Sequence, residues 1–78
     1  MRLPIGDEDV PHLKSTIEFP DCIIPFLEDM SLYYKHVGKY TYKLTVKFQN
    51  NVGEVLYVEK MLHTQAEQDI KRKQRLFH

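Results

Sequence analysis

A strict alternation of apolar and polar residues marks the middle of the chain. Over Tyr40–Gln49, every second residue from Tyr40 to Phe48 is apolar, and the residues between them are threonine, lysine or glutamine. A period of two residues is that of a strand with one buried face. The connection 50–53 and the returning segment 54–62 predict an antiparallel hairpin, with a three-residue loop in which Gly53 supplies the positive φ.

The register of this hairpin follows from the predicted loop. If Gly53 closes the loop, Phe48 lies opposite Leu56 and Leu44 lies opposite Lys60. The apolar faces of the two strands then coincide, whereas a slip of one residue would place Leu44 opposite an acidic side chain. We therefore predict a hairpin with one apolar face and one mixed polar and aromatic face.

Two other segments have the spacing of amphipathic helices. In residues 25–36, apolar side chains recur every three to four positions, Pro25 stands in the first turn, and Gly38 follows the end. A second helix begins at Thr64, which forms the sequence of a capping box with Glu67. The apolar stripe of this second helix is narrow and consists of Ala66, Ile70 and Phe77.

The beginning of the chain has no helical period. Residues 1–14 contain prolines and a glycine among charged residues, which predicts an extended arm. Residues 15–19 alternate and are followed by Pro20, which predicts a short third strand. With 78 residues there is room for one core. We therefore expect an α+β fold, in which residues 15–78 form a single small domain with both helices packed on one face of the sheet.

The composition limits the cellular compartment. Cys22 is the only cysteine, so no internal disulfide can form. An unpaired thiol is typical of a reducing compartment. No apolar stretch approaches the roughly 20 residues that span a bilayer, and the acidic beginning of the chain is unlike a signal peptide. We expect a cytoplasmic protein that has no membrane partner.

Signatures of metal binding and catalysis are missing from the sequence. The four histidines have no i,i+4 spacing, and Cys22 has no second cysteine beside it. There is no nucleophile elbow, phosphate loop or Cys/His signature, and so small a core leaves little room for a desolvated pocket. The sequence predicts a protein that is not an enzyme and that binds no metal and no cofactor.

Basic residues gather near the C-terminus, although 11 lysines and arginines balance 11 acidic residues in the whole chain. This cluster complements the dipole of the predicted helix, and it also suits contact with phosphates or with an acidic protein surface. The lysines of the hairpin extend this basic cluster. Exposed tyrosines are common in interfaces because they offer a large contact area with few rotatable bonds. The candidate partner-binding residues are Tyr34, Lys43, Lys47, Tyr57, Lys71, Arg72, Lys73 and Arg75.

Three functions fit these features. A hairpin alone is only marginally stable in water and has unpaired edges. A helix with a narrow apolar stripe suggests that a partner contributes the rest of its apolar contacts. We predict a protein-binding module, an inhibitor or regulator that covers a surface of a larger protein; a homodimer through a strand edge is another form of such pairing. The alternatives are a nucleic-acid-binding protein that uses the basic helix and the hairpin lysines, and a structural subunit of a larger assembly.

Overall fold

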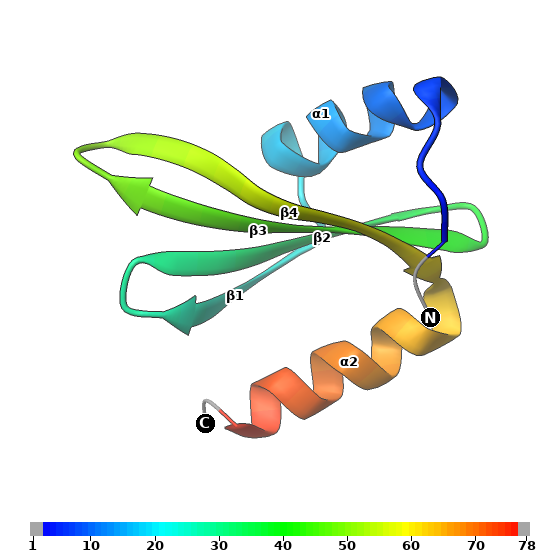
Figure 1. The fold of residues 1–78 in the computed structure, drawn as a ribbon. Coiled ribbons are helices and arrows are strands. Elements are labelled where there is room, and N and C mark those ends of the chain that lie inside the picture. Colours follow the sequence, from blue (N-terminus) through cyan, green and yellow to red (C-terminus); the bar gives the residue numbers. More distant parts are fainter. Residues whose placement is uncertain (1–2, 77–78) are drawn as a thin grey trace.

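The computed structural model describes residues 3–76, with side chains for residues 3–74, and these form four strands, two α-helices and one short 3-10 helix (Figure 1). The strands are β1 (Cys22–Leu27), β2 (Met30–Val37), β3 (Tyr40–Gln49) and β4 (Val52–Leu62). They form one antiparallel sheet in chain order. The 3-10 helix η1 (Asp7–Asp9) leads into α1 (Val10–Glu18), and α2 (His63–Leu76) follows β4 directly. The α+β class is confirmed, with a four-stranded sheet in place of the predicted hairpin and short third strand.

The two α-helices lie on opposite faces of the sheet, α1 above it and α2 below it in Figure 1. Alternate residues of β3 show this directly. The Tyr42 hydroxyl donates a hydrogen bond to Asp9, at the beginning of α1, whereas the neighbouring Lys43 donates to Asp69 of α2. The prediction that both helices pack on one face is therefore wrong. We call the two sides of the sheet the α1 face and the α2 face.

The β3–β4 hairpin is confirmed, but its loop and its register differ from the prediction. Asn50 and Asn51 both have positive φ, 55° and 64°, and form a two-residue turn. Such a turn matches the twist of the strands, and asparagine tolerates this conformation well. Gly53 lies in β4 opposite Phe48, and Leu56 is an extra residue that forms a bulge. The bulge returns the apolar residues of β4 to the α1 face, with Val58 opposite Leu44.

The helix predicted over residues 25–36 is wrong, because this segment forms most of β1 and β2. Glu28 and Asp29 make the turn between the two strands. In β2, Tyr34 is buried toward α2 while Tyr33 lies on the α1 face beside Phe48. A strand that has apolar residues on both faces shows no alternation with polar residues, so its period of two is lost. Gly38 does have positive φ, 62°, but in the turn between β2 and β3.

The extended arm predicted over residues 1–14 is helical from Asp7 onward. Pro11 stands in the first turn of α1, where the missing N–H would have had no partner in the helix. Residues 15–19, predicted as a strand, are the end of α1 and the residue that follows it. Thr16 is fully buried, and its hydroxyl donates to the carbonyl of His12 at 2.7 Å.

The helix predicted near the C-terminus is confirmed as α2, which begins at His63. Ile70 packs on the buried cluster of Ile24, Leu32 and Tyr34 on the α2 face, while Phe77, predicted to complete the apolar stripe, lies outside the described residues. Within residues 3–76, no helix is long and apolar enough to cross a membrane.

Candidate functional site

The two ends of the α1 face differ in how far their apolar side chains are buried. Leu44 and Val46 are buried on this face, at 1% and 4% exposure. Around them, toward the hairpin tips, lie apolar side chains that stay open to solvent. We call this set the apolar patch: Ile23, Tyr33, Phe48, Val55 and Val58.

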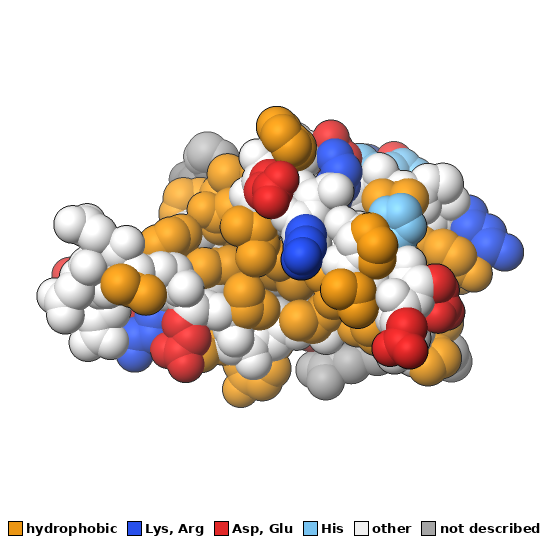
Figure 2. Space-filling model, turned by 90° about the horizontal axis from the view of Figure 1, so that it is seen from above, with side chains coloured by type: hydrophobic (Ala, Val, Ile, Leu, Met, Phe, Trp, Pro, Cys, Tyr) orange, Lys and Arg blue, Asp and Glu red, His pale blue; other side chains and the backbone are white. Residues whose placement is uncertain are grey.

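The patch is continuous across the four strands. Ile23 lies opposite Tyr33, which lies opposite Leu44, which lies opposite Val58. Figure 2 shows hydrophobic side chains gathered over this part of the sheet, seen from the side of α1. Ile23 is 50% exposed and Phe48 is 43% exposed, so side chains that normally belong to a core remain half in water.

The patch is open because α1 is short. Its nine residues make a helix about 14 Å long, whereas the ten residues of β3 extend over at most about 30 Å. α1 contacts β2 and β3. On this face of the sheet it does not cover the strand ends near the turns at 28–29 and 50–51. A sheet face normally buries its apolar side chains against a second layer. At this end of the α1 face, α1 does not provide that second layer.

The two edges of the sheet, formed by β1 and β4, are each interrupted. β1 is short and carries Pro25, which has no N–H to donate. β4 has the bulge at Leu56, and the N–H of Leu3 donates to the carbonyl of Lys60 at 3.0 Å. Bulges, prolines and covering segments are the usual devices that protect an edge from further pairing. Both edges of the sheet therefore carry features that hinder the pairing of a further strand.

A buried carboxylate fixes α1 next to the patch. Asp9 accepts hydrogen bonds from the Tyr42 hydroxyl and from the N–H of Gly6, and Lys60 Nζ lies 3.1 Å from its Oδ1. The bond from Tyr42 is the main cause that lowers the pKa of Asp9 to about 2, with Gly6 and Lys60 adding to it. Burial and the same bond raise the pKa of the Tyr42 hydroxyl.

This network predicts a specific sensitivity to acid. Because the pKa of Asp9 is lowered to about 2, its contribution to stability is fully present above about pH 4 and is lost as the pH falls toward 2. Tyr42→Phe removes the main cause of that shift. The variant is expected to be less stable at pH 6, and to lose less stability between pH 4 and 2, in urea unfolding followed by circular dichroism. Tyr57→Phe, which changes an exposed tyrosine, is the matched control; equal acid losses in all three proteins would contradict the role of the network.

On the α2 face, the predicted contact residues Tyr34 and Lys43 form an internal network. The hydroxyl of the fully buried Tyr34 donates to Asp69 at 2.6 Å, and Lys43 Nζ lies 2.9 Å from the same carboxylate and 3.7 Å from Glu59. Burial tends to raise the pKa of Asp69, but the bonds from Tyr34 and Lys43 outweigh it and the pKa is lowered. Tyr34 therefore ties α2 to the sheet and does not present a contact surface.

The remaining predicted basic residues belong to α2 and to the α2 face of β3. Lys47 lies 3.8 Å from Asp29 at the turn between β1 and β2, and Lys73 lies over the ring of Phe26, 5.0 Å from its centre. Lys71 and Arg72 are exposed on α2. The side chain of Arg75, in the last turn of α2, lies outside the described part of the chain, and Tyr57 is 62% exposed on the α2 face.

A polar pocket of about 250 Å³ lies between α2 and the neighbouring strands. It is lined by Lys43, Glu59, Met61, Gln65, Gln68, Asp69 and Arg72. The carboxylates of Glu59 and Asp69, which line the pocket, both lie beside Lys43, so much of the charge in the pocket is paired internally. This pairing leaves a weak electrostatic field for a phosphate.

Other chemistry is sparse in the part of the molecule that the structure describes. No three side chains among His, Cys, Asp and Glu in residues 3–76 are grouped to enclose a metal ion. The Cys22 thiol is partly buried, and burial, helped by Asp21, raises its pKa. A raised pKa disfavours the reactive thiolate.

Comparison with protein-family models, with curated proteins and with solved structures gave no match. Inference about function therefore rests on the geometry described above. The alternation in the hairpin predicts a buried face that includes Phe48 and Val58, since alternation shows which residues share a face but not how much of that face a helix covers.

Proposed function

We propose that this protein is a protein-binding module that covers a surface of a larger protein, and that it binds an amphipathic helix of that protein on the apolar patch. The observation that carries the proposal is the half-open α1 face. Its half-exposed residues Ile23 and Phe48 adjoin the buried Leu44 and Val46 in one continuous surface. A partner helix would complete the layer that α1 begins.

A helix fits this surface better than an added strand does. Both edges of the sheet are interrupted, β1 by Pro25 and β4 by the bulge at Leu56. The apolar patch lies beside α1, which packs on the same face of the sheet. In a partner helix with apolar residues every three to four positions, those side chains would pack against Phe48 and Val58, as in a helix bound in an apolar groove.

Paired substitutions on the two faces of β3–β4 test this proposal. The double variant Phe48→Gln/Val58→Gln makes the patch polar, and Val52→Gln/Tyr57→Gln changes two more exposed residues of the hairpin on the α2 face. Tagged proteins are used to capture partners from nuclease-treated lysate of the source cells. A partner that binds the wild type and the α2-face variant, but binds the patch variant about tenfold or more weakly, is the expected result.

The opposite result is also informative. A partner retained by the patch variant and lost from the α2-face variant would place the contact on the other side of the sheet and contradict the proposal. Circular dichroism of both double variants checks that each is folded. Salt-sensitive recovery of nucleic acid from untreated lysate, without a partner protein in stoichiometric amount, would favour the nucleic-acid alternative.

A further inference from the structure

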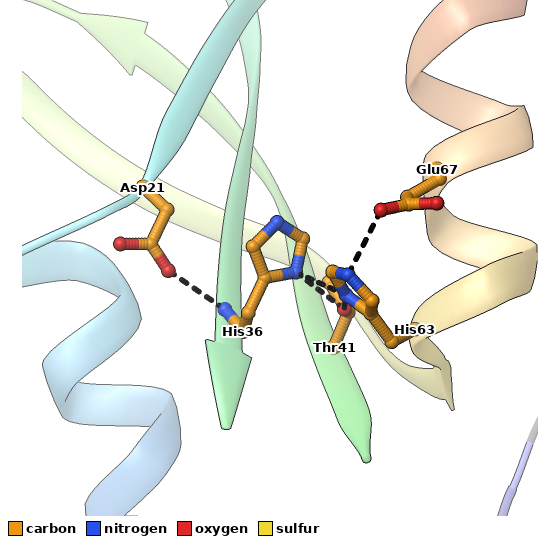
Figure 3. Close-up of polar contacts among 5 residues, drawn as sticks. All are labelled: Asp21, His36, Thr41, His63 and Glu67. Carbon is orange, nitrogen blue, oxygen red and sulfur yellow. Dashed lines mark hydrogen bonds and ion pairs between the residues drawn. The ribbon is translucent and has the colours of Figure 1, made fainter. Parts of the chain in front are cut away.

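Three polar atoms from three different elements meet at the end of the sheet where β2 turns into β3 (Figure 3). Nδ1 of His36 lies 2.9 Å from Nδ1 of His63 and 2.7 Å from Oγ1 of Thr41. Oγ1 of Thr41 lies 3.3 Å from Nδ1 of His63. The two imidazole rings are perpendicular, with their centres 4.2 Å apart.

The contacts around this triangle orient its nitrogen atoms. Nε2 of His63 lies 3.0 Å from a carboxylate oxygen of Glu67, one turn further along α2. That contact favours the tautomer with the proton on Nε2, which leaves the lone pair of Nδ1 directed at His36 and Thr41. A carboxylate that holds the far nitrogen of a histidine in this way is the usual support of a metal-binding imidazole.

The backbone around the triangle is fixed independently of the imidazoles. The N–H of His36 donates to the carboxylate of Asp21 at 2.8 Å, and the N–H of His63 donates to the carbonyl of Lys39 at 3.0 Å. Thr41 is fully buried between them. The side chain of His63 is 38% exposed, so solvent reaches part of its ring.

We propose that His36 and His63 bind a divalent transition-metal ion of the zinc and copper class through their Nδ1 atoms. Imidazole nitrogen suits this class of ion and suits Mg²⁺ or Ca²⁺ poorly. Two nitrogen ligands of a tetrahedral zinc ion lie roughly 3.3 Å apart, given bond lengths of about 2.0 to 2.1 Å. The observed 2.9 Å is the hydrogen-bonded separation, so a small opening of the pair admits the ion once the proton between the two Nδ1 atoms has moved to Nε2 of His36.

The remaining ligands and the structural effect follow from the same geometry. The Thr41 hydroxyl contacts either the ion or a water bound to it, and solvent fills the open positions. Since His36 belongs to β2 and His63 begins α2, the ion joins the sheet to the first turn of the helix. A ligand that binds the folded chain in this way raises the temperature of unfolding.

Calorimetric titration with zinc chloride, with magnesium chloride as the hard-cation control, tests the site. His36→Gln and His63→Gln are each expected to weaken zinc binding by more than tenfold, and Glu67→Gln by about tenfold through loss of the supporting carboxylate. His12→Gln is the matched control, because His12 stacks on Tyr42 on the opposite face of the sheet. It should bind zinc as the wild type does.

A spectroscopic measurement on the wild type keeps the test independent of variant folding. Histidine ¹⁵N spectra recorded during the zinc titration should show a coordination shift of Nδ1 in His36 and His63 and no such shift in His12. The inference is overturned if zinc does not bind, if zinc affinity is unchanged when both His36 and His63 are replaced, or if the Nδ1 signals of His36 and His63 do not respond.

Discussion

Leu44→Ala is expected to remove about 3 kcal/mol from the free energy of unfolding, within the range of roughly 2 to 5 kcal/mol for buried leucine truncations. Leu44 is 1% exposed and lies in the centre of the sheet on the α1 face. A domain of this size commonly has only about 3 to 5 kcal/mol of net stability, so the variant should keep at most about 2 kcal/mol and be partly unfolded at physiological temperature. Urea unfolding followed by circular dichroism measures the effect.

The control for this substitution is Leu27→Ala. Leu27 is at the end of β1 and is 55% exposed, so the same chemical change removes far less buried surface. Its expected cost is below about 1 kcal/mol. Equal losses in the two variants would show that the core does not centre on Leu44.

Lys43→Met is expected to cost about 2 kcal/mol because it removes the cation that is hydrogen-bonded to the carboxylate of Asp69. The side chain of Lys43 is 11% exposed and that of Asp69 is 21% exposed. The expected cost is below the roughly 3 to 5 kcal/mol of a fully buried pair, since solvent reaches part of Asp69. Methionine keeps the length and the apolar stem of the lysine, so the loss reports mainly the missing charge. Urea unfolding at pH 7 gives the cost.

Two further measurements separate this charge effect from a packing effect. Adding Asp69→Asn to Lys43→Met should recover part of the lost stability, because no uncompensated carboxylate is then left beside Tyr34. The cost of Lys43→Met should also shrink below about pH 4, where the unpaired carboxyl group takes up a proton. A cost that is independent of pH and is not relieved by Asp69→Asn would argue for packing alone.

The sequence could predict the elements whose two sides differ in polarity. The strand Tyr40–Gln49 alternates, and along α2 the acidic residues Glu67 and Asp69 come before the basic ones. Residues 25–36 could not be assigned in the same way, since Tyr33 and Tyr34 pack on opposite faces of β2 and both are apolar. The α1 segment was missed because Pro11 reads equally well as a loop residue or as the first turn of a helix.

The candidate site was less predictable than the fold. Whether Phe48 is buried depends on the length of α1, which is more than 25 residues away in the sequence. Likewise, His36 and His63 lie 27 residues apart and meet only through the register of the sheet. Residue type predicts Tyr34 as a contact residue, and the polar face of the hairpin predicts Lys43, but Asp69, which accepts hydrogen bonds from both, could not be identified as their partner without the fold.

The most direct test of the apolar patch compares two adjacent positions of β4 that face opposite sides of the sheet. A photo-crosslinking amino acid is placed at Val58, on the α1 face, or at Tyr57, on the α2 face, and the captured partner is mapped by mass spectrometry. The account predicts crosslinks from position 58 to one partner, at residues spaced three to four apart as in a helix. Crosslinks mainly from position 57, or at partner residues spaced two apart as in an added strand, would contradict it.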